Sequence, residues 1–173
     1  MSPDADPARP VALVLTGVSG VGKSTVAQVI AERTGWAFCE ADELQPATNV
    51  ARMKAGIPLT DLDRHPWLIA VRGWIDAQPG PVVVSCSALR RSYRALLAEA
   101  RRPVWFVELT GDFDQVWPRL SSRAAPYMNA TQLESQYAAQ QPLTVDEPGA
   151  RVSVDGDPDT VADRVLATLD RTS

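Results

Sequence analysis

The chain has 173 residues, of which 45% are hydrophobic and 22% are charged, a balance typical of one globular domain with an adequate core. The formal net charge of −4 argues against a nucleic-acid partner held by bulk electrostatics, so an anionic ligand would have to meet local basic side chains. The two cysteines, Cys39 and Cys86, are too few for a zinc site or a disulfide framework, and we interpret them as buried thiols.

The first ten residues are polar, acidic and rich in proline. They lack the basic residues of a signal peptide, and the apolar run after them is too short to span a membrane. We therefore expect residues 1–10 to form a disordered tail and residues 11–173 to form one domain. We also expect a cytoplasmic protein with no membrane partner.

Strand-like and helix-like segments alternate along the rest of the chain. Strands are predicted at Val11–Leu15, Ala37–Cys39, Val82–Ser85, Val104–Leu109 and Arg151–Val154. Helices are predicted at Lys23–Arg33, Asn49–Ala55, Pro66–Gln78, Arg90–Ala100, Phe113–Arg123, Thr131–Gln140 and Asp159–Asp170. Continuous apolar runs fit strands buried on both faces. The pattern predicts a three-layer α/β/α fold with a central parallel five-stranded sheet, whose ligands gather at the carboxyl ends of the strands.

A phosphate-binding loop follows the first predicted strand. Residues 17–24 match the complete pattern G-x-x-x-x-G-K-[ST], between a buried strand and a helix-like segment. Glycines let successive backbone N–H groups turn toward a β-phosphate, and the helix N-terminus adds partial positive charge. Lys23 is expected to reach the β- and γ-phosphates, and Ser24 to bind Mg²⁺. The alternative is a glycine-rich turn without a ligand. The predicted nucleotide-binding residues are Gly17, Val18, Ser19, Gly20, Val21, Gly22, Lys23, Ser24 and Thr25.

Two carboxylates follow the second predicted strand. Glu40 and Asp42 should therefore emerge at the ligand-binding edge of the sheet. Phosphoryl transfer needs one carboxylate to orient or deprotonate the acceptor hydroxyl, and often another to hold Mg²⁺. We assign the first role to Asp42 and the second, together with Ser24, to Glu40. Asp42 could instead cap the segment that follows it.

Arginines near these strand ends are candidates for binding an anionic or polyhydroxy acceptor. Arg52 lies on a short predicted helix and could clamp such a ligand in bidentate fashion. Ser87, Arg90 and Arg91 follow the third predicted strand and fit the same pocket. Arg90 and Arg91 could equally decorate a helix surface.

The segment before the predicted Pro66 helix is charged. Asp61 and Asp63 are interpreted either as solvated loop charges or as N-caps of a helix whose first turn holds Pro66. His65 is the single histidine, and we place it at the surface. Base chemistry then falls to carboxylates.

Arg119 and Arg123 are four residues apart, so they share one face of a predicted helix. This face points toward a suspected mobile flap at residues 124–129, and the lid is assigned to approximately residues 119–140. Arg119 is expected to cover the adenine, and Arg123 to stabilise charge on the transferred phosphoryl group. The alternative is two exposed helix arginines.

Together these motifs resemble the gluconokinase family, small P-loop kinases related in fold to shikimate and nucleoside monophosphate kinases. The matching stretches are residues 17–24, 49–53, 56–61, 63–68, 86–94, 109–113, 135–137, 141–142 and 147–149. The resemblance implies a helical lid and ATP-dependent phosphorylation of D-gluconate to 6-phosphogluconate with Mg²⁺. It also implies that Asp42 orients the acceptor hydroxyl, that Arg52 binds substrate and that Arg123 is the lid arginine. The family often forms homodimers, so a homodimer is expected.

The chain departs from the family's pattern at two places. It has Glu40-Ala41-Asp42 and Gln45-Pro46 where the family typically has Asp-Gly-Asp and His-Pro. It has Ala125-Pro126-Tyr127 where the lid typically carries Gly-His-Phe. Glutamine hydrogen-bonds hydroxyls but cannot become cationic, and proline removes a donor. Two alternatives follow: a same-fold kinase for another small sugar acid or polyol, and a catalytically weak nucleotide-binding metabolite sensor.

Overall fold

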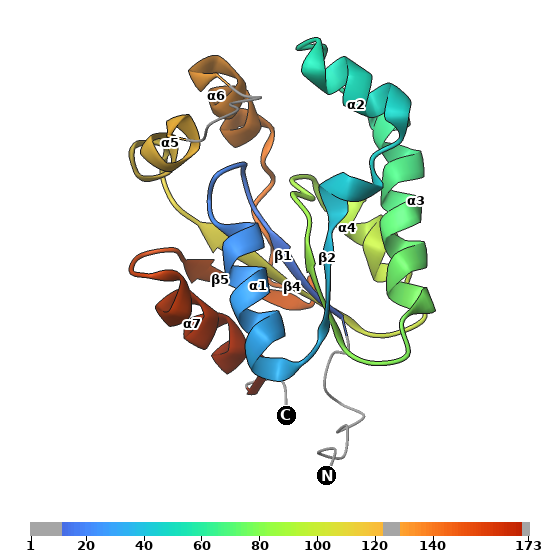
Figure 1. The fold of residues 1–173 in the computed structure, drawn as a ribbon, viewed down its shortest axis with the longest axis vertical. Coiled ribbons are helices and arrows are strands. Elements are labelled where there is room, and N and C mark those ends of the chain that lie inside the picture. Colours follow the sequence, from blue (N-terminus) through green and yellow to red (C-terminus); the bar gives the residue numbers. More distant parts are fainter. Residues whose placement is uncertain (1–11, 123–128, 171–173) are drawn as a thin grey trace.

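A parallel five-stranded sheet forms the centre of the computed structural model, which describes residues 12–122 and 129–170 (Figure 1). The strand order is β2-β3-β1-β4-β5, and every neighbouring pair is parallel. The strands are β1 (Ala12–Thr16), β2 (Ala37–Glu40), β3 (Val82–Ser85), β4 (Val104–Thr110) and β5 (Gly149–Ser153). The predicted sheet is confirmed.

Helices cover both faces of this sheet, because alternate strand side chains point in opposite directions. Leu13 and Leu15 of β1 pack into a core with α1 and α7, whereas Ala12 and Val14 pack into a second core with α3 and α4. The three-layer architecture is therefore confirmed. The helices are α1 (Lys23–Thr34), α2 (Ala47–Lys54), α3 (Asp61–Ala77), α4 (Arg91–Ala98), α5 (Phe113–Ser121), α6 (Ala130–Ala139) and α7 (Pro158–Asp170).

Helix α3 begins at Asp61, whereas the sequence analysis placed its start at Pro66. The cause is a capping box. The Thr60 hydroxyl accepts a hydrogen bond from the Asp63 backbone N–H at 3.1 Å, and the Asp63 carboxylate accepts from the Thr60 N–H at 2.9 Å. Pro66 lies inside the helix. The interpretation of Asp63 as a cap of a helix that starts near Pro66 was therefore wrong. Asp63 belongs to the capping box of a helix that starts at Asp61.

A short 3-10 helix, η1 (Ala41–Leu44), follows β2 and was not predicted. It carries Asp42 directly after the end of β2 at Glu40. At the same edge of the sheet, α5 and α6 stand on one side and α2 on the other (Figure 1). The carboxyl ends of β1, β2 and β3 lie at this edge, between α2 and the pair of helices α5 and α6 (Figure 1).

The remaining expectations concern single side chains. Cys39 and Cys86 are buried and unbridged, as predicted, and burial raises the pKa of the two thiols to about 11 and about 12, respectively. His65 is exposed, also as predicted. Among the described helices, none has the length and apolar character needed to cross a membrane.

Candidate active site

The loop at residues 17–24 joins β1 to α1 through glycines in the left-handed region. Gly17, Gly20 and Gly22 have φ values of 139°, 81° and 111°, which side chains with a Cβ rarely adopt. A Cβ on Gly17 would also lie 2.9 Å from the Leu109 carbonyl oxygen. Gly22 caps α1 without a side chain, so the helix end is open to an anionic ligand.

Polar side chains of this loop face the ends of β2 and β3. Lys23 Nζ donates to the carbonyl oxygens of Gly17 and Val18, both at 2.9 Å. The Ser24 hydroxyl donates to the Glu40 carboxylate and lies 3.2 Å from Ser85 Oγ. Burial raises the pKa of Glu40, and the hydrogen bond from Ser24 opposes that rise.

The Ser24 and Glu40 pair fits the expected magnesium ion chemically. Both are hard oxygen donors from neighbouring elements, and Mg²⁺ prefers oxygen. Proteins usually hold this ion through one or two side chains, with water and phosphate oxygens completing its shell. The structure thus brings together the two residues that the sequence analysis assigned to Mg²⁺.

A cavity of about 310 Å³ opens beside Lys23, between the segment after α2 and helix α6. Its lining includes Asp42 from η1 and Ser87 from the loop after β3. A second cavity, of about 280 Å³, shares Ser87 and Arg64 with the first and adds Arg90. The predicted residues Lys23, Glu40, Asp42, Ser87 and Arg90 therefore line two adjoining cavities. Together these could hold an elongated molecule with its reacting end at Lys23 and its far end at the arginines.

Arg64 lines both cavities and was missed by the sequence analysis. Its guanidinium donates to the Leu59 carbonyl oxygen at 2.8 Å and to the Tyr93 hydroxyl at 3.1 Å, and it lies 5.5 Å from the centroid of the Tyr93 ring. The missed signal is helical spacing: Arg64 precedes the buried Trp67 and Leu68 by three and four residues. That spacing is informative only once α3 starts before Pro66.

Two other predicted arginines lie outside the walls described for these cavities. Arg52 is exposed, with Nη1 3.7 Å from the Asp63 carboxylate. Arg91 is also exposed; it pairs with Asp146 and donates to the Thr144 hydroxyl at 2.8 Å. The structure therefore does not bring Arg52 and Arg91 together with Asp42.

A separate cavity of about 380 Å³ lies against the same loop. It is lined by Gly20, Gly22 and Thr25 of the loop region, by Arg119 of α5 and by Pro158 of α7. The predicted residues Gly20, Gly22, Thr25 and Arg119 therefore line one cavity. Arg123 and the departure at residues 125–127 lie outside the described residues.

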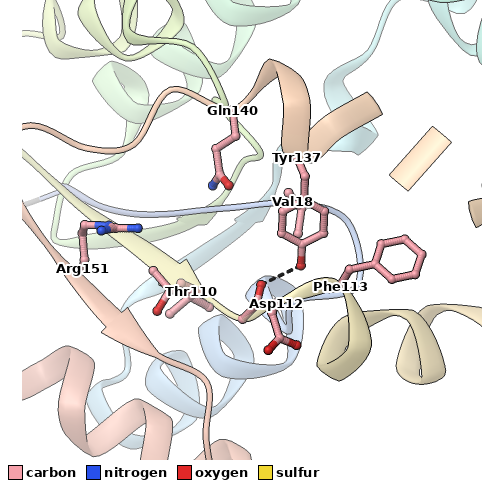
Figure 2. A pocket seen from close by; sticks show the side chains of 9 residues that line it. Val18, Thr110, Asp112, Phe113, Tyr137, Gln140 and Arg151 are labelled. Atoms are coloured by element: carbon pink, nitrogen blue, oxygen red, sulfur yellow. Dashed lines mark hydrogen bonds between the residues drawn. The ribbon is translucent and has the colours of Figure 1, made fainter. Parts of the chain in front are cut away.

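Helix α6 contacts the loop and the start of α5 through consecutive residues. The Gln136 carboxamide accepts a hydrogen bond from the Ser19 backbone N–H at 2.7 Å and donates to the Ser19 hydroxyl at 3.1 Å. The Tyr137 hydroxyl donates to the Gly111 carbonyl oxygen at 2.6 Å. Tyr137 is one of the residues that line a cavity of about 450 Å³. In Figure 2 its side chain is drawn between those of Phe113 and Arg151.

A buried ion pair fixes the loop that carries Ser87. Arg94 Nε donates to Glu147 at 2.8 Å, and the two side chains are only 2% and 9% exposed. Burial would raise the pKa of Glu147, but hydrogen bonds from Arg94 and Thr144 lower it. Arg94 also donates a hydrogen bond of 3.1 Å to the carbonyl oxygen of Ala88. The φ angle of Ala88 is +36°, which is in the left-handed region. The pair thus holds a strained turn directly after Ser87.

Comparisons with known proteins agree on one relationship, although no family model matches the chain. A gluconokinase of Gluconobacter oxydans is 42% identical over 161 residues, which cover 91% of this chain and 90% of that protein. The crystal structure of a gluconokinase from Sinorhizobium meliloti has a TM-score of 0.85 at 39% identity, over 94% of this chain and 93% of that one. Shikimate kinase from Aquifex aeolicus, at 14% identity and a TM-score of 0.58 over 92% and 96% of the two chains, shares the fold alone.

Proposed function

Because the chain belongs to the gluconokinase family and is a kinase, we propose that it transfers the γ-phosphoryl group of ATP to the C6 hydroxyl of D-gluconate. The products are ADP and 6-phospho-D-gluconate. The observation that carries the proposal is one cavity in which Lys23 of the phosphate-binding loop and Asp42 of η1 share a wall. A phosphoryl donor and a hydroxyl acceptor can therefore meet there.

The donor side binds the triphosphate through the N-terminus of α1 and through backbone N–H groups of the loop other than those of Gly17 and Ser19, which donate to Ser87 and Gln136. The adenine occupies the cavity lined by Arg119. Ser24 and Glu40 would hold Mg²⁺, which when bound supplies positive charge against the β- and γ-phosphate oxygens. The lid at approximately residues 119–140 and the action of Arg123 on the transferred group stay predictions, because residues 123–128 lie outside the described residues.

The transfer itself is an in-line displacement at phosphorus. Asp42 accepts the proton of the C6 hydroxyl as the oxygen of that hydroxyl bonds to the γ-phosphorus. The bond from the γ-phosphorus to its bridging oxygen breaks, and ADP leaves with that oxygen. Lys23 lies at the same wall of the cavity and stabilises the charge that spreads over the phosphoryl oxygens.

The acceptor extends from Asp42 into the adjoining cavity. Arg64 and Arg90 line that second cavity and face the carboxylate of the sugar acid, since a guanidinium matches a carboxylate in bidentate geometry. Ser87 and Gln45 provide hydrogen bonds to the hydroxyl groups between the two ends. The homodimer and the cytoplasmic location stay predictions.

The test is a coupled assay of ADP release across a panel of acceptors. Gluconate, other aldonates, uncharged polyols and shikimate are compared at equal concentration with MgATP, and the phosphorylated carbon is identified by ³¹P and ¹³C NMR. We expect gluconate to give the highest kcat/KM and phosphorylation at C6. Robust turnover of another acceptor without turnover of gluconate would overturn the substrate assignment.

The role of Arg64 predicts a defect confined to the acceptor. Arg64→Met should raise the KM for gluconate about 10- to 100-fold, the cost of losing hydrogen bonds to a charged group, while the KM for MgATP changes little. Steady-state kinetics with each substrate varied in turn measures both constants.

Arg72→Met is the matched control for Arg64→Met. Arg72 lies two turns further along α3, where its guanidinium pairs with Glu99. It is not among the residues described as lining the two cavities. An unchanged gluconate KM in Arg64→Met would remove this residue from the site. Arg52→Met and Arg91→Met belong in the same series, because a raised gluconate KM in either would support its predicted role.

A further inference from the structure

One side chain of α6 reaches the phosphate-binding loop. Gln136 pairs with Ser19 at two points, through the backbone N–H and through the hydroxyl, although the two residues lie 117 positions apart. The backbone N–H groups of such a loop are the donors that otherwise face phosphate oxygens. In this chain the third residue of the loop instead donates to an uncharged carboxamide.

The segment directly after α6 contacts the acceptor side. The backbone N–H of Gln141, two residues beyond α6, donates to the Leu89 carbonyl oxygen at 2.8 Å. Its side chain accepts from the Arg91 backbone N–H at 2.8 Å. Gln141 is thus hydrogen-bonded to the segment after β3 that carries Ser87. Helix α6, which ends two residues earlier, is bonded to Ser19. Residues 136–141 therefore span the distance between the donor loop and the acceptor loop.

We propose that Gln136 is a positioning residue for phosphoryl transfer. A backbone hydrogen bond from Gly17 to Ser87 already fixes the first residue of the donor loop to the acceptor loop. Gln136 fixes the third residue, Ser19, and it holds α6 over the cavity that both Gln136 and Ser19 line. This inference rests on the proposed function. Its physical basis is that small misplacements of reacting groups cost large factors in rate, and that a closed cavity keeps water away from the phosphoryl group.

Gln136→Met tests this role, because methionine keeps the length and apolar stem of the side chain but makes neither bond to Ser19. We expect kcat to fall about tenfold, within the range that misplacement costs, while calorimetry shows MgATP binding within about threefold of wild type. We also expect more ADP to be released than 6-phosphogluconate is formed, because water gains access. A merely structural role would not change this ratio.

Tyr137→Phe is the matched control, since it removes the neighbouring hydrogen bond from α6 to Gly111 and leaves Ser19 untouched. It should stay within about twofold of wild type in kcat and in the ratio of the two products. Equal values in Gln136→Met and Tyr137→Phe would overturn the proposal, because general anchoring of α6 would then explain both.

Ser19→Ala provides a second, milder variant should Gln136→Met fold poorly in a thermal melt. It removes only the hydroxyl half of the pair, so we expect a smaller decrease in kcat in the same direction, and no additivity in the double variant. A product ratio equal to that of wild type in Ser19→Ala, together with full additivity, would refute the coupling.

If wild-type protein did not phosphorylate gluconate, the proposed function itself would fail, which is a different result from an unchanged product ratio in an active enzyme.

Discussion

Lys23→Met is expected to lower kcat about 10³-fold, the scale of losing a cation that stabilises a transferred phosphoryl group. Lys23 Nζ lies 2.9 Å from two carbonyl oxygens of its own loop, and the side chain lines the cavity that holds Asp42. Methionine keeps the reach of the side chain and removes its charge. The charge that develops on the γ-phosphoryl oxygens then has no ammonium partner. Initial rates of ADP release at saturating gluconate measure the effect.

The chain contains its own control for this substitution, because lysine occurs at only one other position, Lys54. Lys54 ends α2 and is exposed. Lys54→Met removes the same charge and should leave kcat within about twofold, as expected for an exposed charge that is screened by solvent and is not among the residues described as lining the cavity. If Lys23→Met retained more than a tenth of wild-type kcat, Lys23 would have no direct part in the transfer.

Asp42→Asn should reduce kcat by about 10²-fold or more, the usual contribution of a positioned general base. Asparagine still accepts a hydrogen bond from the acceptor hydroxyl but cannot take its proton. The triphosphate is held by the loop at residues 17–24, so the affinity for MgATP should remain near that of wild type. The release of ADP measures kcat, and calorimetry measures the affinity for MgATP.

Glu43→Gln is the control for Asp42→Asn. Glu43 is the next residue of η1, carries the same charge and is exposed, but it is not among the side chains described as lining the acceptor cavity. Its kcat should be unchanged within about twofold. Near-normal turnover by Asp42→Asn would leave the proton transfer to another group.

Local patterns made much of this fold predictable. The apolar runs Val82–Val84 and Val104–Val107 fitted buried strands, and the glycines of residues 17–22 indicated a turn into a helix. The start of α3 was misplaced because the prediction relied on proline at a first helical turn. The capping box at Thr60 and Asp63 outweighed that preference.

The acceptor side was harder to predict because its contacts are long-range. Arg52 and Arg64 look equivalent in the sequence, and only the packing of α3 against the sheet turns Arg64 toward the cavity. The pairing of Gln136 with Ser19 follows from no spacing rule, because the two residues lie 117 positions apart in the sequence. Sequence patterns thus predicted the chemistry of the donor loop, and tertiary packing decides which side chains meet the acceptor.

The close packing of Gly17 has a consequence for how the site arises during synthesis. The backbone N–H of Gly17 donates to the carbonyl oxygen of Ser87, and its Cα faces the carbonyl oxygen of Leu109, leaving no room for a side chain. Both partners are synthesised long after the loop that they hold. A nascent chain that ends before β3 therefore carries every residue of the phosphate-binding motif but neither of these two partners, and one that ends before β4 still lacks Leu109. We therefore expect ATP to bind the completed sheet and not to act as a template on which the first βα unit folds.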